Sequence, residues 1–168
     1  MAKQQLRLPT DEEEADINAK RTLGQKRLGV GKEASPSDVA QAADEFVDAQ
    51  QIERSKYFKG FYLLVFHNPQ ALINEIGAAW GEQLIRAFGW QWQYVIRESE
   101  FERAVVSPDK AFVVFPDNYL GRMLEPPYED VTLMLMFNMI QAKKLPEVSA
   151  GALEDISDGR LRHIVPKR

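Results

Sequence analysis

The chain has 168 residues, of which 45% are hydrophobic and 27% are charged, and its formal net charge is −4. This composition is typical of one soluble globular domain, and a chain of this length buries about 70% of its unfolded surface. The absence of cysteine excludes disulfides, thiolate metal sites and thiol nucleophiles, and the presence of only two histidines excludes a multi-histidine metal centre. The negative net charge gives no general reason to expect nucleic acid or an anionic membrane as a partner.

The first residues do not have the pattern of a secretory signal. They read MAKQQLRLPTDEEEAD, without an apolar stretch or a small-residue cleavage site. The two most apolar runs, 61–66 and 131–140, are much shorter than the about 20 residues that cross a bilayer. We therefore expect a cytoplasmic protein that does not associate with membranes.

Residues 1–34 form a charged N-terminal arm. Acidic side chains come first and basic ones follow, which is the order that a helix dipole favours. Thr10 and Glu13 have the spacing of a capping box, so the pattern predicts a polar helix over about 11–28. Because the apolar stripe of this segment is thin, a docked helix and a disordered arm both remain open.

Further helices are predicted from their start signals. Ser35-Pro36-Ser37-Asp38 combines a capping box with proline at the first helical position, and a helix over 36–56 follows. The uniformly apolar run 57–66 is interpreted as helical. Asn68-Pro69 then begins a helix over 69–88.

The helix over 69–88 carries a broad apolar face and a notch. Gly77 and Gly81 leave a smooth surface that another element can approach closely. Packing inside the fold is the first interpretation of this notch, and a ligand site is the alternative. Glu82 follows the notch and is either a pocket residue or a surface residue. The apolar face consists of Leu72, Ile76, Trp80, Leu84 and Phe88.

From position 90 the hydrophobic period changes to two. Strands are predicted over 90–97, 101–107 and 111–115, with short turns between them. These strands would form a three-stranded antiparallel meander. The face with the aromatic residues of the first strand is expected to pack against the helices.

The opposite face of this meander is predicted to be polar. An ordinary solvated face is the first interpretation, and a surface that binds a partner protein is the alternative. Glu102 or Arg103 would join it, depending on the register of the second strand. The candidates for partner binding are Gln91, Gln93, Arg97, Glu102 and Arg103.

The C-terminal third contains two more predicted helices. Asp117 is expected to cap a short helix, and Asp130 to open a final helix that ends near Lys144. Its segment 131–140 is Met-rich and apolar nearly all round, which indicates burial in the core, in a partner, or in a homodimer seam. Residues 146–168 have few large apolar side chains and are expected to form a flexible tail.

Taken together, these elements predict a single α+β domain over 35–145. A three-stranded antiparallel β-meander packs against several α-helices in this prediction. The arm 1–34 and the tail 146–168 flank the domain.

Four short motifs resemble a known family. They are Ile-Gly-Ala-Ala-Trp-Gly-Glu-Gln-Leu at 76–84, Gly-Trp-Gln-Trp at 89–92, Ala-Val-Val at 104–106 and Val-Phe-Pro at 114–116. They are similar to the bacterial family catalogued as domain of unknown function 3806, over about residues 73–140. The resemblance implies an α+β fold in a bacterium, and it brings no catalytic residues. Small bacterial α+β domains include immunity proteins that neutralise toxins, although fold alone does not imply function.

No residue pattern indicates catalysis. His67 and His163 lie in no motif of nucleophilic catalysis, and the acids Glu98, Glu100 and Glu102 lie on or beside an exposed turn. Basic residues do not alternate with exposed aromatics as they do in RNA-binding sheets. We therefore expect no catalytic residue, no metal, no cofactor and no nucleic acid, and the chain is not expected to be an enzyme.

Two functions follow from these features. The first is a non-catalytic, protein-binding module, such as an immunity or accessory protein that binds a toxin or a secreted effector. The alternative is a small-molecule-binding domain or a weak hydrolase with a cleft near Glu82. Glu82, Tyr119 and Arg122 are the pocket candidates of that alternative.

Overall fold

The structure has the α+β class that the sequence predicts. The computed structural model describes residues 5–56, 69–97 and 100–158, so the predicted helix over 57–66 lies outside the described residues. Within these ranges no helix is long and apolar enough to cross a membrane. The elements in chain order are β1 (Gln5–Arg7), α1 (Asp11–Arg27), α2 (Pro36–Ser55), α4 (Pro69–Phe88), β2 (Gln91–Arg97), β3 (Glu100–Val106), β4 (Phe112–Val114), α5 (Pro116–Leu124), α6 (Leu133–Gln141) and β5 (Glu154–Asp155).

The sheet contains the predicted meander and two further strands. Its order is β1-β2-β3-β4-β5, in which the first three pairs are antiparallel and β4 pairs with β5 in parallel. The predicted three-stranded sheet is therefore incomplete. The added strands β1 and β5 have three and two residues, too few for an alternating pattern to appear in the sequence.

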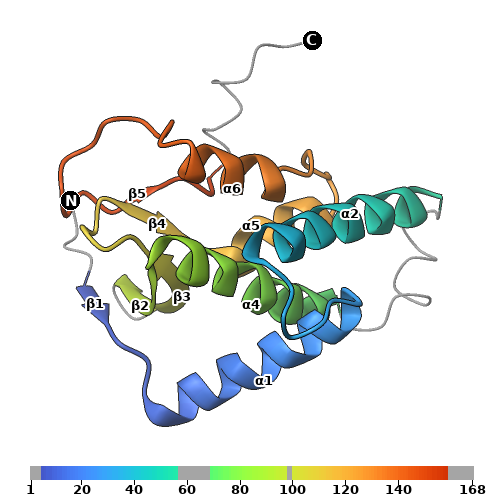
Figure 1. The fold of residues 1–168 in the computed structure, drawn as a ribbon, viewed down its shortest axis with the longest axis horizontal. Coiled ribbons are helices and arrows are strands. Elements are labelled where there is room, and N and C mark those ends of the chain that lie inside the picture. Colours follow the sequence, from blue (N-terminus) through green and yellow to red (C-terminus); the bar gives the residue numbers. More distant parts are fainter. Residues whose placement is uncertain (1–4, 57–68, 98–99, 159–168) are drawn as a thin grey trace.

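Helix α4 lies at the centre of the fold. It contacts α1, α2, α5, α6 and β3. In the view of Figure 1, α1 runs along one side of α4 and α6 lies on the opposite side. Ile76, Trp80 and Leu84 are fully buried in the main hydrophobic core. The spacing of four residues in the sequence thus marks the buried face of this helix.

The glycine notch of α4 is filled by side chains of the same chain. A Cβ on Gly77 would lie 2.6 Å from a carboxylate oxygen of Asp117, and one on Gly81 would lie 2.5 Å from the indole ring of Trp92. Both distances are shorter than ordinary carbon contacts, so a side chain at either position would displace these groups. Packing inside the fold, the first interpretation of the notch, is confirmed.

The N-terminal arm is a docked helix. Thr10 and Glu13 form the predicted capping box, and Ile17 is buried. Arg7 of β1 donates two hydrogen bonds of 2.6 Å to Glu13, and these bonds and the backbone of Thr10 lower the pKa of the Glu13 carboxyl to about 2. The end of β1 is in this way fixed to the start of α1.

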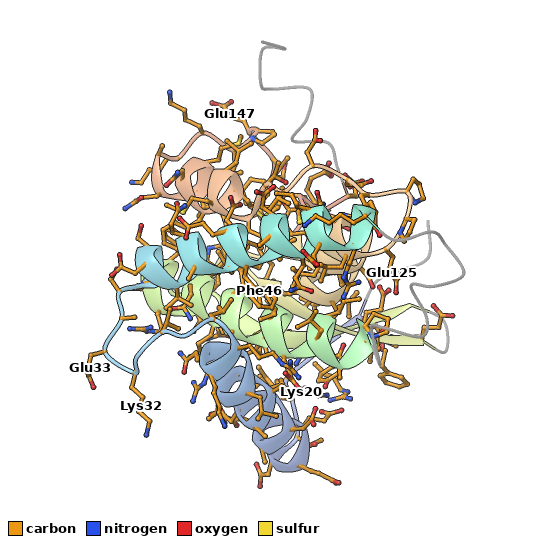
Figure 2. The ribbon with its side chains drawn as sticks, turned by 90° about the vertical axis from the view of Figure 1, so that its right-hand side faces the viewer. Lys20, Lys32, Glu33, Phe46, Glu125 and Glu147 are labelled. Atoms are coloured by element: carbon orange, nitrogen blue, oxygen red, sulfur yellow. The ribbon has the colours of Figure 1, made fainter. Side chains whose placement is uncertain are left out.

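Helix α1 ends where the sequence predicts. Gly29 follows it with a φ of 67°, a left-handed conformation that glycine adopts without strain. The connection to α2 then passes over the surface. Figure 2 shows Lys32 and Glu33 projecting from this connection away from the body.

The two C-terminal helices begin differently from the prediction. Phe115, not Asp117, is the N-cap of α5, because the Asp117 carboxylate pairs with Arg103 instead. Helix α6 begins at Leu133, later than the predicted start at Asp130. Its first turn is capped from α2, where the Asp44 carboxylate accepts the backbone N–H of Met134 at 2.9 Å. Partners distant in sequence therefore decide both starts.

The Met-rich segment is buried within the fold. Leu133, Met136 and Phe137 are at most 1% exposed, and Phe137 packs on Phe88 of α4 with ring centroids 5.0 Å apart. Of the alternatives that the sequence left open for this segment, the core accounts for its most apolar side chains. These side chains are already buried within the chain, so their burial does not require a homodimer interface on this helix.

The predicted tail is folded as far as residue 158. Ile156 belongs to the main core, and the buried Ser157 hydroxyl accepts the backbone N–H of Phe115 at 3.2 Å. The expectation of a flexible tail from residue 146 therefore needs correction for 146–158. A two-residue strand and two apolar side chains, Leu153 and Ile156, are too weak a signal to predict this docking.

Replacing Gly24 by alanine is expected to weaken the docking of α1 on α4. The new Cβ would lie 2.1 Å from the carbonyl oxygen of Glu75 and 2.8 Å from the Cβ of Ala79. Overpacking costs about 1–3 kcal/mol, whereas alanine gains about 1 kcal/mol over glycine inside a helix. Urea unfolding should show that Gly24→Ala lowers the free energy of unfolding.

Gly121→Ala in α5 is the matched control. The nearest atom to its new Cβ is the Cδ1 of Ile73 at 4.0 Å, an ordinary contact, so stability should rise by up to about 1 kcal/mol. Equal stability of Gly24→Ala and the wild type would contradict a close contact between α1 and α4.

Candidate functional site

A pocket of about 440 Å³ lies between the N-terminal arm and the body of the domain. We call it the arm–body pocket. Its walls come from the segment after β1, from α1, from α4 and from the start of β2. The lining residues are Leu8, Pro9, Glu14, Ile17, Asn18, Arg21, Glu82, Ile85, Trp90, Gln91 and Trp92.

Helix α1 contributes one face to this pocket. Glu14, Ile17, Asn18 and Arg21 are spaced i, i+3, i+4 and i+7, and they therefore lie on one side of the helix. Three of these four side chains are polar, and they carry both signs of charge. The apolar stripe of α1 is thin because much of its inner face lines a pocket instead of a dry core.

Glu82 is held in this pocket by two donors. Its Oε1 accepts a hydrogen bond from Arg21 Nη1 at 3.0 Å, and its Oε2 accepts one from the indole Nε1 of Trp92 at 3.3 Å. The Glu82 side chain is 15% exposed, against 33% for Arg21. Since Trp92 lies against the bare backbone of Gly81, the glycine lets the indole come close enough to reach Glu82.

The rest of the pocket is mainly apolar. Trp90 is buried, Trp92 and Ile85 are half-buried, and Leu8 is 66% exposed. Aromatic and aliphatic walls with a few fixed polar groups are the usual lining of a small-molecule site. The arrangement can hold an apolar group against the tryptophans and a polar group beside Glu82 and Arg21.

The three pocket candidates from the sequence do not share one cleft. Glu82 lines the arm–body pocket, whereas Tyr119 is buried and its hydroxyl lies 2.6 Å from the Thr132 Oγ1. Arg122 lines a different pocket of about 590 Å³, and it pairs there with Glu129 at 3.3 Å. The expected grouping is therefore wrong, because no residue of α5 lines the arm–body pocket.

The register of β2 and β3 separates the candidates for partner binding. Glu102 pairs with Val95 and so shares the face of Gln91 and Gln93, whereas Arg103 pairs with Tyr94 on the helix side. Arg97 ends β2 opposite Glu100.

The face that carries Gln91 is less polar than predicted. Gln91 is exposed and Glu102 is half-buried, but Gln93 is only 8% exposed. The polar surface expected from the alternation is therefore interrupted by a second apolar cluster on this face. Its buried members are Val95, Ala104, Val106, Val113 and Phe115.

Arg103 is a buried structural residue. Its side chain is 7% exposed, and its Nη2 donates to the Asp117 Oδ1 at 2.6 Å and to the Asn74 carbonyl at 3.1 Å. The guanidinium also lies over the Trp92 ring, 5.3 Å from the centroid. Burial raises the pKa of the Asp117 carboxyl above its ordinary value of 3.8, and the Arg103 charge opposes this rise. Arg103 thus joins β3, α4 and α5 behind the Trp92 wall of the pocket.

Sequence reasoning missed the contribution of the arm to the pocket. Glu14, Asn18 and Arg21 were not singled out from the sequence, although their helical spacing puts them on the same side of α1 as Ile17. Glu75 was also missed; it forms an ion pair with Arg27 of α1. Pairs of acids on α4 and bases on α1 can be recognised only after the two helices are known to pack together.

Comparisons with known proteins assign neither a family nor a function to this chain. Comparisons of the chain with models of protein families, with curated proteins and with solved structures give no match. The resemblance to the family of domain of unknown function 3806 stays an expectation. In residues 5–56, 69–97 and 100–158 no group of three His, Asp or Glu side chains is placed to hold a metal ion.

Replacing Arg103 by methionine is expected to destabilise the fold in a pH-dependent way. Removing one partner of a buried ion pair costs about 3 kcal/mol, because the other charge stays buried. A carboxyl with a raised pKa favours the folded state below its unfolded pKa of 3.8, and this advantage is lost as the pH rises through the folded pKa. Without Arg103 the folded pKa rises further, so the loss in Arg103→Met should be small in acid and larger near neutral pH.

Urea unfolding at several pH values measures this difference. The control is the double variant Arg103→Met/Asp117→Asn, which has no carboxyl at this position and should lose the extra pH dependence. If Arg103→Met costs the same free energy in acid and near neutral pH, Asp117 is not the group that Arg103 holds ionised.

Proposed function

We propose that this chain is a small-molecule-binding domain and that the arm–body pocket is its binding site. The observation that supports this most is the position of Glu82 in an aromatic-lined pocket, where Arg21 and Trp92 fix its two oxygens. A polar group held in a defined orientation beside apolar walls gives a ligand both affinity and direction. The volume of about 440 Å³ falls within the range of about 300–1,000 Å³ that such sites have.

The contacts of Glu82 favour binding over hydrolysis. A general base must be able to reach the proton that it removes. Each Glu82 oxygen already accepts a hydrogen bond from the protein, and neither Tyr119 nor Arg122 lines the same pocket. These facts support the binding part of the alternative that the sequence left open, and they give the weak-hydrolase part no further support.

A pocket-filling substitution tests the proposal. Single-ring compounds are screened for those that raise the melting temperature of the full chain. A ligand at about 100 times its Kd adds about 2.7 kcal/mol, or roughly 5–10 °C for a domain of this size. Asn18→Phe places a ring in the pocket from an exposed position on α1, and it should abolish these shifts without loss of stability.

Ala19→Phe is the matched control, because Ala19 is exposed on the same helix but does not line the pocket. It should leave the shifts unchanged. If no compound stabilises the wild type, or if Asn18→Phe keeps the shifts, the arm–body pocket is not a ligand site.

Binding of another protein is our second proposal, and one surface feature favours it. Phe101 is 58% exposed, and it pairs across the sheet with Ile96. Arg7 lies over Phe101 at 5.4 Å and over the Tyr94 ring at 4.5 Å. Aromatic residues beside arginine are common energetic centres of protein interfaces. An immunity or accessory role would use such a patch to bind a toxin or an effector.

Purification of the tagged chain from its native host tests this second proposal. Phe101→Ala should lose a stoichiometric partner, because the centre of the patch is removed. Leu23→Ala should keep the partner. Leu23 is also an exposed apolar residue, at 49%, but it lies on α1 and outside the group of Arg7, Tyr94 and Phe101. Recovery of the chain without a partner, or equal recovery with both variants, would speak against this role.

A further inference from the structure

We propose that the ligand of the arm–body pocket is a free amino acid with a large apolar side chain, bound as its zwitterion. This inference rests on the proposed function and names the chemical class of the ligand. The inference follows from the adjacent positive and negative charges of Arg21 and Glu82 and from the apolar walls next to them.

The charged groups of the pocket suit a ligand with both signs of charge. Arg21 and Glu82 lie side by side, with 3.0 Å between Nη1 and Oε1. A ligand with one charge is attracted by one of them and repelled by the other. A zwitterion placed in the opposite order sets its carboxylate against Arg21 and its ammonium group against Glu82, so that both contacts are attractive.

Donors and acceptors remain for such a ligand. Among the described residues, the Arg21 guanidinium makes one hydrogen bond, to Glu82, and guanidinium has five N–H groups. The Glu14 side chain makes no hydrogen bond or ion pair within the described part of the chain. It lies two turns before Arg21 on α1, about 10 Å along the axis, and lines the same pocket. Glu14 therefore adds a second negative charge to the pocket, whereas the ammonium group next to the Arg21-bound carboxylate faces Glu82.

The remaining walls of the pocket indicate which kind of side chain the amino-acid ligand has. Trp90, Trp92 and Ile85 form the body side of the pocket, and Leu8 and Pro9 form the arm side. None of these walls has a free charge, and the Trp92 N–H is already used by Glu82. A large aliphatic or aromatic side chain gains from burial against these five residues, whose surfaces are mainly apolar. The polar lining residues Asn18 and Gln91 are exposed to solvent.

The main competitor is an apolar amine. Glu14 and Glu82 together outweigh Arg21 by one charge in this pocket, and indole faces attract cations. An amine, however, leaves the free N–H groups of Arg21 without a partner and places a second cation beside the guanidinium. The zwitterion is favoured because it satisfies both members of the ion pair.

Calorimetric titration of the full chain with four related probes tests the inference. The probes are L-phenylalanine, its methyl ester as the cation, N-acetylphenylalanine as the anion and N-acetylphenylalanine amide as the neutral form. We expect L-phenylalanine to bind and each blocked form to bind at least about tenfold more weakly, because one charged contact is lost.

Two variants assign the charges to residues. Arg21→Gln should weaken the binding of L-phenylalanine and of the anion but not that of the cation, which the guanidinium repels. Glu82→Gln, which keeps the length of the side chain and an acceptor for the Trp92 N–H, should weaken the binding of L-phenylalanine and of the cation but not the binding of the anion. Glu12→Gln is the matched control, because Glu12 is an exposed acid on α1 that does not line the pocket, and it should bind all probes as the wild type does.

Three results would overturn the inference. The methyl ester binding as tightly as L-phenylalanine would make the pocket an amine site. Equal binding of the neutral form would make the charges irrelevant. No binding of either L-phenylalanine or L-leucine up to about 10 mM, ten times a weak Kd of about 1 mM, would exclude the class. These results leave the proposed function standing. It fails only if, in addition, no single-ring compound raises the melting temperature of the wild type, or if Asn18→Phe keeps the shifts.

Discussion

The close approach of other groups to the bare backbone of α4 is the constraint on which the rest of the structure depends. Gly77 admits the Asp117 carboxylate and Gly81 admits the Trp92 indole, each nearer than any Cβ would allow. The two contacts bring α5 and the sheet onto the same helix. Because the interior is packed close to crystal density, such contacts have little freedom to shift. The position of Trp92, and with it the donor for Glu82, follows from this packing.

The second long-range feature is the docking of a polar helix. Helix α1 has too few apolar residues to be held by burial alone, and its contacts with α4 are a mixture of one buried isoleucine, a close backbone approach at Gly24 and ion pairs to Glu75 and Glu82. A mixed interface of this kind does not close completely. The arm–body pocket is the space left where α1 and the body meet, and this explains why its lining combines charges with tryptophans.

The elements whose signals are local were predicted well. The capping boxes at Thr10 and Ser35 are formed as expected, and the helix over 69–88 has the predicted bounds, because caps and helical periodicity depend on residues within one or two turns. Asp117 was misplaced as a cap because a buried arginine from another strand is a stronger partner for a carboxylate than the backbone of a helix start. Pro116 at the first position of α5 is a local start signal that was not used in the prediction. The start of α6 could not be predicted from neighbouring residues, because its first turn is capped by Asp44 of α2.

The sequence by itself determined the α+β class, the helices α2 and α4, the central meander and the apolar face of α4. It also predicted the bounds of α1 but left open whether that helix is docked or disordered. These features follow from period, capping and turn chemistry, which are properties of short segments. Only the tertiary structure decided the register that separates Glu102 from Arg103, the strands β1 and β5, and the meeting of Arg21 with Glu82, 61 residues apart. Such pairings depend on which elements pack together. Contacts between residues far apart in the chain leave no local pattern in a single sequence from which they could be predicted.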